Sequence, residues 1–231
     1  MSTASPVVVA IPTLNEEDSI GAVVASIPRA VVTRVIIADG GSTDRTVERA
    51  ERAGAEVIAA GKGYGRACLK ATEVAAENAI MVFMDGDGAD DVGSIAKMVA
   101  PIHAGDYDFV IGSRVRGERD TGSMAWHQVL VGLVAGQAMR AMYGVTYTDM
   151  CAFRAIRRNV LIGLGMREMT YGWNIEMQMR AARSRLRVLE LPVSYHRRIG
   201  GESKVAGSLQ GTIRAGSRII ATFCRVAAQP R

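Results

Sequence analysis

The stretch Ala79-Ile80-Met81-Val82-Phe83-Met84-Asp85-Gly86-Asp87 places a six-residue apolar run directly before two carboxylates. A continuous apolar run of this length, bounded by turn residues, is typical of a strand buried on both faces of a sheet. Carboxylates at the end of such a strand can hold Mg²⁺ or Mn²⁺, which keeps its other positions for water and phosphate oxygens. The stretch therefore predicts a buried sheet with chemistry on a diphosphate at its edge.

The two carboxylates also have other interpretations. Asp and Gly are common turn formers, so the stretch taken alone indicates a tight turn equally well. An EF-hand loop is excluded, because its sixth position would be Asp90 rather than Gly and its twelfth Ala96 rather than Glu. A haloacid-dehalogenase-type phosphatase also has Asp-x-Asp after an apolar strand. That family normally opens with the motif near its N-terminus, whereas here the motif is at Asp85.

Strand-like and helix-like segments alternate outward from this stretch. We expect strands at 7–11, 35–38, 56–59, 79–84 and 109–111, with helices at 16–27, 44–53, 66–78 and 92–103. This alternation predicts an α/β fold with a mostly parallel, Rossmann-like sheet that has helices on both faces. The second half is expected to hold helices at 123–143, 157–165, 172–184 and 207–226, a strand at 187–193 and a basic loop at 195–204. No repeat or linker interrupts the pattern, which predicts a single domain over 1–231.

Polar loops follow the expected strands. Ligands of parallel sheets bind beyond the carboxyl ends of the strands, so these loops should converge on one rim. Asp39 could accept hydrogen bonds from a nucleoside or only close a turn, and Lys62 could touch a phosphate or be solvated. Arg114 could clamp a diphosphate, and the basic loop could close over it as a mobile lid. The loops are Pro12-Thr13-Leu14-Asn15-Glu16, Asp39-Gly40-Gly41-Ser42, Gly61-Lys62-Gly63, Asp85-Gly86-Asp87, Gly112-Ser113-Arg114 and His196 to Lys204.

Composition narrows the class of protein. The three cysteines are far apart, which suggests a reducing cytoplasm and makes a zinc site improbable. Residues 1–113 hold 9 Lys/Arg and 16 Asp/Glu, a net charge of −7, whereas residues 114–231 hold 19 and 7, a net charge of +12. Such polarity indicates an anionic partner. Aromatic residues make up only 5% and do not interleave with basic ones, which argues against nucleic acid.

Eight sequence blocks together resemble family 2 glycosyltransferases of the GT-A fold, and the later blocks resemble the dolichol-phosphate mannose synthase branch. The resemblance covers about residues 7–220. The blocks are Pro12 to Glu17, Asp39 to Thr46, Gly61-Lys62-Gly63, Asp85-Gly86-Asp87, Gly112-Ser113-Arg114, Thr148 to Ala155, Tyr171 to Glu176 and Arg198 to Lys204.

This resemblance implies a metal-dependent inverting enzyme that transfers a hexose from a nucleotide-sugar, GDP-mannose or a UDP-sugar, to polyprenyl phosphate. The first half, 1–113, would bind the nucleotide, and 114–231 the acceptor. The donor would contact Pro12, Thr13, Asn15, Glu16, Asp39, Lys62, Asp85, Gly86 and Arg114. Mg²⁺ or Mn²⁺ would bind Asp85 and Asp87, and the acceptor phosphate would bind Arg198, Ser203 and Lys204. The catalytic residues would be Asp87, Arg114 and Asp149.

The role of Asp149 depends on the acceptor. A lipid phosphate is already an anionic nucleophile, so it needs no strong base. A hydroxyl acceptor would need one, and Asp149 is then the candidate, although it could equally position the acceptor. Transfer to a soluble hydroxyl acceptor and a non-catalytic nucleotide-binding protein remain alternatives.

The chain also departs from the branch pattern. Ala89 stands where Gln often adds a metal contact, and Asp90 could replace it or extend the turn. Gly40 replaces a common Asp, which weakens inference about the base. Cys151-Ala152 replaces the usual Ser-Gly, which leaves the acceptor details open.

Membrane contact is expected without a membrane span. We expect no secretory signal in Met1 to Pro6 and no transmembrane helix, since no apolar segment reaches about 18 residues. In the helix at 207–226, Leu209, Ile213, Ile220 and Phe223 fall near one face, with arginines elsewhere. The helix therefore predicts peripheral attachment at the cytoplasmic face of a membrane, with core packing or a homodimer interface as alternatives.

Overall fold

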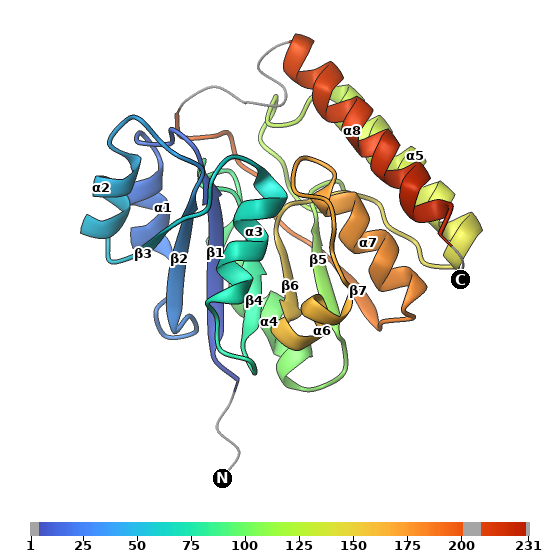
Figure 1. The fold of residues 1–231 in the computed structure, drawn as a ribbon, viewed down its shortest axis with the longest axis horizontal. Helices are drawn as coiled ribbons and strands as arrows, with labels where there is room; N and C mark the ends of the chain where they lie inside the picture. The colour runs from blue at the N-terminus through green and yellow to red at the C-terminus, as the bar shows by residue number, and fades with distance from the viewer. Residues whose placement is uncertain (1–4, 201–208, 230–231) are drawn as a thin grey trace.

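The computed structural model describes residues 5–200 and 209–229. These residues build a seven-stranded sheet flanked by helices (Figure 1). The strand order is β3-β2-β1-β4-β6-β5-β7, and every neighbouring pair is parallel except those made by β6, which runs antiparallel to β4 and β5. The predicted α/β fold with a mostly parallel sheet is confirmed. The strands are β1 Val7–Thr13, β2 Arg34–Asp39, β3 Glu56–Ala59, β4 Ile80–Phe83, β5 Phe109–Ser113, β6 Arg154–Arg157 and β7 Val188–Pro192.

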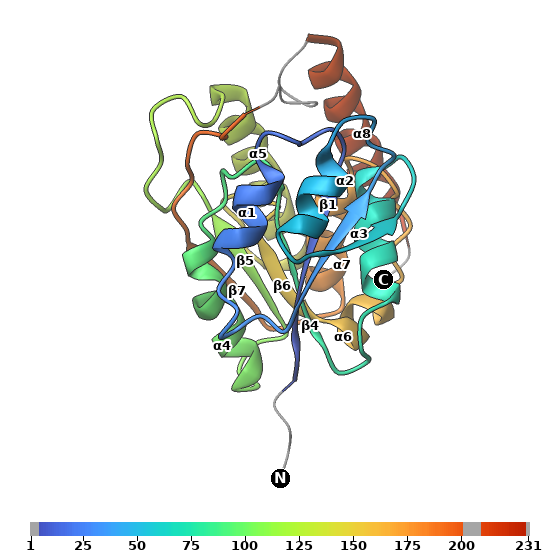
Figure 2. The same cartoon turned by 90° about the vertical axis from the view of Figure 1, so that its left-hand side faces the viewer.

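Helices cover both faces of the sheet. Figure 2 shows α1 and α4 on one face and α3, α6 and α7 on the other. Helix α8 packs against α7 and therefore forms an outer layer. The helices are α1 Ile20–Ser26, α2 Thr46–Arg52, α3 Tyr64–Glu73, α4 Ile95–His103 after a 3₁₀ turn η1 Val92–Ser94, α5 Trp126–Tyr143, α6 Arg158–Gly163, α7 Trp173–Arg183 and α8 Leu209–Ala227.

The centre of the sheet is the core of the molecule. All residues of β4 are buried, as are nearly all of β1 and all of β5. A strand covered by helices on both sides cannot alternate polar and apolar residues, which is why these strands read as continuous apolar runs.

Strand β6 was not expected from the sequence. Its four residues, Arg154 to Arg157, are short and begin and end with arginine, so they give no clear strand pattern. The strand pairs Arg154 with Phe83 of β4 and with Ile111 of β5. Because β6 is antiparallel, its amino end lies at the carboxyl ends of its neighbours. This brings the segment before it, 148–153, to the rim where the polar loops gather.

The first two helices begin later than the sequence predicted. Helix α1 begins at Ile20 rather than at residue 16, because Glu16 to Ser19 form a turn in which the Glu16 carbonyl accepts from the amides of Ser19 and Ile20. Helix α2 begins at Thr46, and neither Ser42 nor Thr43 caps it. The Ser42 hydroxyl instead donates to Asp39 at 2.5 Å. Both differences keep polar side chains of the loops at the rim.

Candidate active site

The acidic loop after β4 is shaped by its own carboxylates. Oδ2 of Asp90 accepts from the Asp85 amide at 2.9 Å, and Oδ1 of Asp87 accepts from the Ala89 amide at 3.0 Å. Gly86 is buried, and its carbonyl accepts from the Ser19 hydroxyl at 2.7 Å. The loop is thus a defined turn, and it holds three carboxylates close together.

Crowding and burial disfavour the charged forms of these acids. Burial raises the pKa of Asp85 well above its ordinary value, and the charges of Asp90 and Asp87 raise it further. Burial also raises the pKa of Asp90, to about 7. The charge of Asp87 raises this pKa too, whereas the hydrogen bond from the Asp85 amide lowers it. A bound cation would remove this penalty, because it favours the ionised carboxylates.

The donor set fits a hard divalent cation. In the part of the chain that the structure describes, no group of three or more His, Cys, Asp or Glu side chains has the arrangement of a complete metal site. Asp85 and Asp87 offer two oxygen ligands, and Mg²⁺ typically binds one or two protein carboxylates together with substrate phosphates and water. Asp90 already uses one oxygen on the Asp85 amide, so it supports the loop beside these two ligands.

The loop after β7 lies directly against the acidic loop. The His196 amide donates to the Ala89 carbonyl at 2.8 Å, and the Ile199 amide donates to the Asp87 carbonyl at 2.9 Å. NH2 of Arg198 lies 3.1 Å from Oδ2 of Asp87 and 3.9 Å from Oε2 of Glu16. Nε and NH1 of Arg198 are buried and have no hydrogen-bond partner among the residues that the structure describes. The structure therefore brings a predicted anion-binding arginine onto the predicted metal carboxylate.

Arg114 and Asp149 form a bidentate ion pair. Nε and NH2 of Arg114 each donate to the Asp149 carboxylate at 2.7 Å, and the Arg114 amide adds a bond at 3.0 Å. Asp149 is 2% exposed. Burial alone would raise the pKa of Asp149, but the hydrogen bonds and charge of Arg114 outweigh it and hold that pKa below its ordinary value.

The expected nucleoside end of the rim is also assembled. The Thr13 hydroxyl at the end of β1 is buried and has no hydrogen-bond partner within 5–200 and 209–229. The Asn15 amide donates to the Ser42 hydroxyl at 2.9 Å, and this hydrogen bond joins the loops that follow β1 and β2. The Asp39 carboxylate accepts from the amides of Gly41 and Ser42, so it does close a turn, as one interpretation of the sequence had it. Lys62 is exposed in the loop after β3, and Pro12 lies within β1.

Sequence reasoning missed two residues of the rim. Glu190 in β7 accepts from the amide and hydroxyl of Thr148 at 2.8 and 2.9 Å, which fixes the backbone next to Asp149. The Tyr195 ring lies over Arg114, with the guanidinium carbon 4.9 Å from the ring centroid. Tyr195 directly precedes the basic loop, which was the available signal. Glu190 gave none, because an acid in a short strand is usually solvated.

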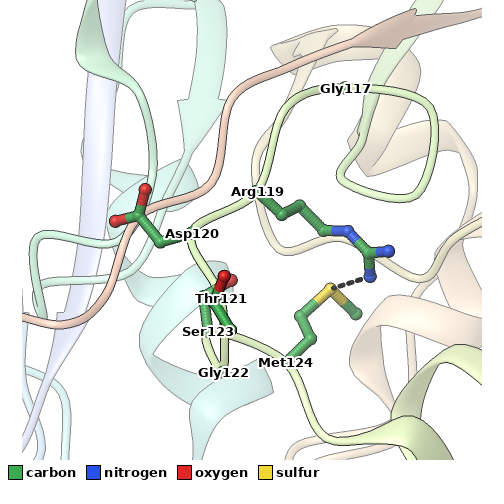
Figure 3. A pocket seen from close by; sticks show the side chains of 7 residues that line it. All are labelled: Gly117, Arg119, Asp120, Thr121, Gly122, Ser123 and Met124. Carbon is green, nitrogen blue, oxygen red and sulfur yellow. Dashed lines mark hydrogen bonds between the residues drawn. The ribbon is translucent and has the colours of Figure 1, made fainter.

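A hollow of about 370 Å³ lies beside the basic loop (Figure 3). Arg119 and Met124 point toward each other across it, whereas Asp120 points away from them. Asp120 accepts from the Arg197 amide at 2.9 Å and donates its own amide to the Tyr195 carbonyl at 3.0 Å. The lining residues are Gly117, Arg119, Asp120, Thr121, Gly122, Ser123 and Met124.

The predicted acceptor residues are only partly covered. Arg198 is placed as described above, whereas Ser203 and Lys204 lie outside the described residues. The roles assigned to the individual site residues stay predictions, as does the division into a nucleotide-binding half and an acceptor-binding half.

The fold defines the class of protein. A solved structure of glucosyl-3-phosphoglycerate synthase from Mycobacterium tuberculosis, in complex with Mn²⁺, UDP-glucose and phosphoglyceric acid, has a TM-score of 0.77 to this chain. The match covers 98% of this chain and 81% of the other at 22% sequence identity, so it shows a shared GT-A-like fold.

Sequence comparison then gives the family. The model of glycosyl transferase family 2 matches residues 8–165, and the chain belongs to this family. An uncharacterised glycosyltransferase of M. tuberculosis is 39% identical over 90% of this chain and 94% of its own length. A dolichyl-phosphate hexose transferase of Haloferax volcanii is 33% identical over 84% of this chain and 83% of its own length. The family resemblance predicted from the sequence blocks is confirmed.

Proposed function

We propose that this glycosyltransferase moves a hexose from a nucleotide diphosphate sugar to a polyprenyl phosphate, with inversion at the anomeric carbon. The observation that carries the proposal is the contact between Asp87 and Arg198, which joins an acidic loop to a basic loop at the rim of the sheet. The acidic loop suits a cation bound to a diphosphate, and the basic loop suits a phosphate. The dolichyl-phosphate hexose transferase among the relatives supports a lipid phosphate as acceptor.

The proposed transfer moves negative charge from the acceptor phosphate to the departing nucleoside diphosphate. An oxygen of the acceptor phosphate attacks the anomeric carbon from the face opposite the diphosphate, a bond forms there, and the bond from this carbon to the diphosphate oxygen breaks. The electron pair leaves with the nucleoside diphosphate, so negative charge develops on it. The unused Nε and NH1 of Arg198 can donate to that charge. Mg²⁺ or Mn²⁺ held by Asp85 and Asp87 would supply further positive charge.

Asp149 is assigned to positioning in this scheme. Its carboxylate is occupied by Arg114, and its pKa is held below the ordinary range, which makes it a weak proton acceptor. An anionic acceptor needs no base, which fits this arrangement. Since Tyr195 lies over the Arg114 guanidinium, the pair also holds the basic loop near the acidic loop.

One observation favours the soluble hydroxyl acceptor as a second candidate. The hollow at residues 117–124 is lined mainly by polar groups, and its volume lies within the range of pockets for small ligands. A small polar acceptor would fit there without any lipid surface.

A transfer assay separates the two candidates. Radiolabelled UDP- and GDP-sugars are incubated with Mn²⁺ and either a short-chain prenyl phosphate or a panel of small hydroxyl acceptors. We expect label in an organic-extractable product only with the prenyl phosphate. Label only in water-soluble products would overturn the lipid acceptor, and absence of turnover with every donor would overturn the transfer proposal.

A further inference from the structure

Helix α5 turns apolar side chains toward solvent. Trp126 is 76% exposed, Leu130 50% and Val134 61%. Half of the ten exposed large apolar side chains within 5–200 and 209–229 lie in this helix, between 126 and 134. The spacing of four, seven and eight residues places Trp126, Leu130, Leu133 and Val134 on one side. We call these four residues the α5 face.

The opposite side of α5 explains this orientation. Gly132, Gly136 and Met139 are its buried residues. A Cβ at Gly136 would collide with the Tyr147 carbonyl, and one at Gly132 would lie 3.6 Å from the Asp149 Cα. The helix therefore packs its glycines onto the segment 147–149 and leaves its bulky residues outside. This reverses the usual pattern of a helix on a protein surface.

The surroundings of the α5 face carry positive charge. No Asp or Glu occurs between Thr121 and Thr148, where Arg140 is exposed. Helix α8 likewise contains no acid and carries Arg214, Arg218 and Arg225. Figure 1 shows α5 and α8 both at the side of the molecule opposite β3. A surface that combines exposed apolar residues with arginines suits an anionic bilayer.

Helix α8 is less available for such contact than the sequence suggested. Phe223 and Ile219 pack against the core, and Thr222 and Val226 are buried. Arg218 and Arg225 pair with Glu168 at 3.2 and 3.4 Å. Ile213 and Ile220 stay exposed at its edge. The helix is therefore anchored to the protein by one side, whereas α5 offers a whole apolar side.

We propose that the α5 face is the surface by which this protein docks on an anionic lipid bilayer, with the exposed Arg140 of α5 and Arg214 of α8 adding attraction. Trp126 at the start of the helix suits the boundary between headgroups and acyl chains. A second copy of the chain is a weaker match, because a symmetric dimer would bring the same basic surroundings against each other.

Docking by α5 would also place the site close to the lipid. The glycine side of the helix touches the backbone of Asp149, which holds Arg114. The site thus lies about one helix diameter, roughly 10 Å, behind the α5 face. This inference builds on the proposed lipid acceptor, and its test reads vesicle binding and sugar transfer separately.

The test is co-sedimentation with vesicles of phosphatidylcholine alone or mixed equally with phosphatidylglycerol. Wild type should sediment with the mixed vesicles, and the double variant Leu130→Glu/Val134→Glu should partition about tenfold less. Val74→Glu, directly after α3, introduces one such charge at an exposed apolar site elsewhere, and it should change partitioning less than about twofold, as a single surface substitution does. Thermal unfolding checks that each variant is folded.

Three outcomes would overturn the proposal. These are failure of wild type to bind mixed vesicles, partitioning of the double variant like wild type, or loss of binding with Ile220→Glu in α8 alone. A dimer in sedimentation velocity that the double variant dissolves, without vesicle binding, would assign the face to a second copy. Transfer to a short-chain prenyl phosphate without vesicles should persist in the double variant. If wild type docks but transfers no sugar, the proposed function fails and the docking surface stands.

Discussion

NH2 of Arg198 lies 3.1 Å from Oδ2 of Asp87, and this contact joins a basic loop from the second half of the chain to an acidic loop from the first. The other guanidinium nitrogens of Arg198 are buried, and no described residue offers them a hydrogen bond. Buried donors are rarely left unused, so their presence next to the acidic loop indicates an anionic ligand.

Arg198→Ala should weaken binding of a nucleoside diphosphate. Loss of hydrogen bonds to a charged group costs about 1.5–3 kcal/mol, or roughly ten- to a hundredfold in Kd. The free energy of unfolding of the ligand-free protein should change little. The variant loses a mostly buried ion pair, with side chains 26% and 13% exposed. It also removes two buried nitrogens that have no partner among the described residues, and the two effects oppose each other. Isothermal titration of UDP and GDP with Mn²⁺ measures the effect. Arg197→Ala, one position away, should bind as wild type, and equal losses in both variants would refute a specific role.

Asp87→Asn should remove the dependence of donor binding on metal. Thermal shifts with UDP- and GDP-sugars should be larger with Mn²⁺ than with EDTA in wild type and nearly equal in the variant. Asp91→Asn is the matched control, because it removes one charge from the same loop and keeps the oxygen that caps the 3₁₀ turn. Metal-dependent shifts of the same size in wild type and Asp87→Asn would exclude Asp87 as a ligand.

Asp149→Asn should destabilise the protein by about 3 kcal/mol, because it leaves the Arg114 guanidinium buried without its counter-charge. The double variant Arg114→Met/Asp149→Leu should recover most of this loss, since it removes both charges. Urea unfolding measures both values. Asp149→Asn should keep the shape of the pH profile of kcat/KM if the residue positions others. Loss of the acidic limb of that profile, the rise of kcat/KM with pH, would identify Asp149 as a general base instead.

Gly136→Ala should cost about 2–4 kcal/mol of stability, because the added methyl group would collide with the Tyr147 carbonyl and push α5 away from the segment 147–149. Gly216→Ala, in α8, meets no atom of the described part of the chain within 4 Å and should instead stabilise the protein by about 0.5–1 kcal/mol. Both variants replace a helical glycine with alanine. Changes of opposite sign in the free energy of unfolding, measured in urea, would therefore report the close packing at Gly136 and not helix propensity. Equal effects would mean that α5 does not pack as closely as described.

The metal-free protein should lose stability as pH rises. Burial, and then the charge of Asp87, raise the pKa of Asp90 from its ordinary 3.8 to about 7. Between these values the folded protein holds a proton that the unfolded chain has released, so the free energy of unfolding falls from about pH 4 to pH 7. Asp85 acts in the same direction. Urea unfolding with EDTA at about pH 5 and about pH 8 measures the slope, and Asp90→Asn should reduce it. An unchanged slope in Asp90→Asn would show that Asp90 is ionised throughout.

The rim of the site could be predicted from the sequence because its parts are local. Each polar loop directly follows an apolar run, and parallel strands must end at the same edge. The acidic loop after β4 and the loop after β1 were found in this way. The order of the strands was beyond this reasoning, because the four residues of β6 carry no strand pattern and are inserted between β4 and β5.

Partners across the site could not be predicted. Glu190 supports Thr148, and Tyr195 lies over Arg114, although nothing in the spacing of these residues links them. For Asp39 the sequence predicted the position but not the contact. Its place at the end of β2 was predicted, but whether its carboxylate faces a ligand or its own loop depended on the position of Ser42.

The sequence by itself determined the α/β fold, the family and the acids that follow β4, because apolar runs and loop chemistry are properties of neighbouring residues. Only the tertiary structure decided that Arg198 meets Asp87, that Arg114 is held by Asp149, and that α5 turns its apolar side outward. Helix α5 is apolar around most of its circumference, so its sequence does not specify an inner side. Close packing of Gly132 and Gly136 against residues 147–149 makes that choice, and such packing exists only when distant parts of the chain are in contact.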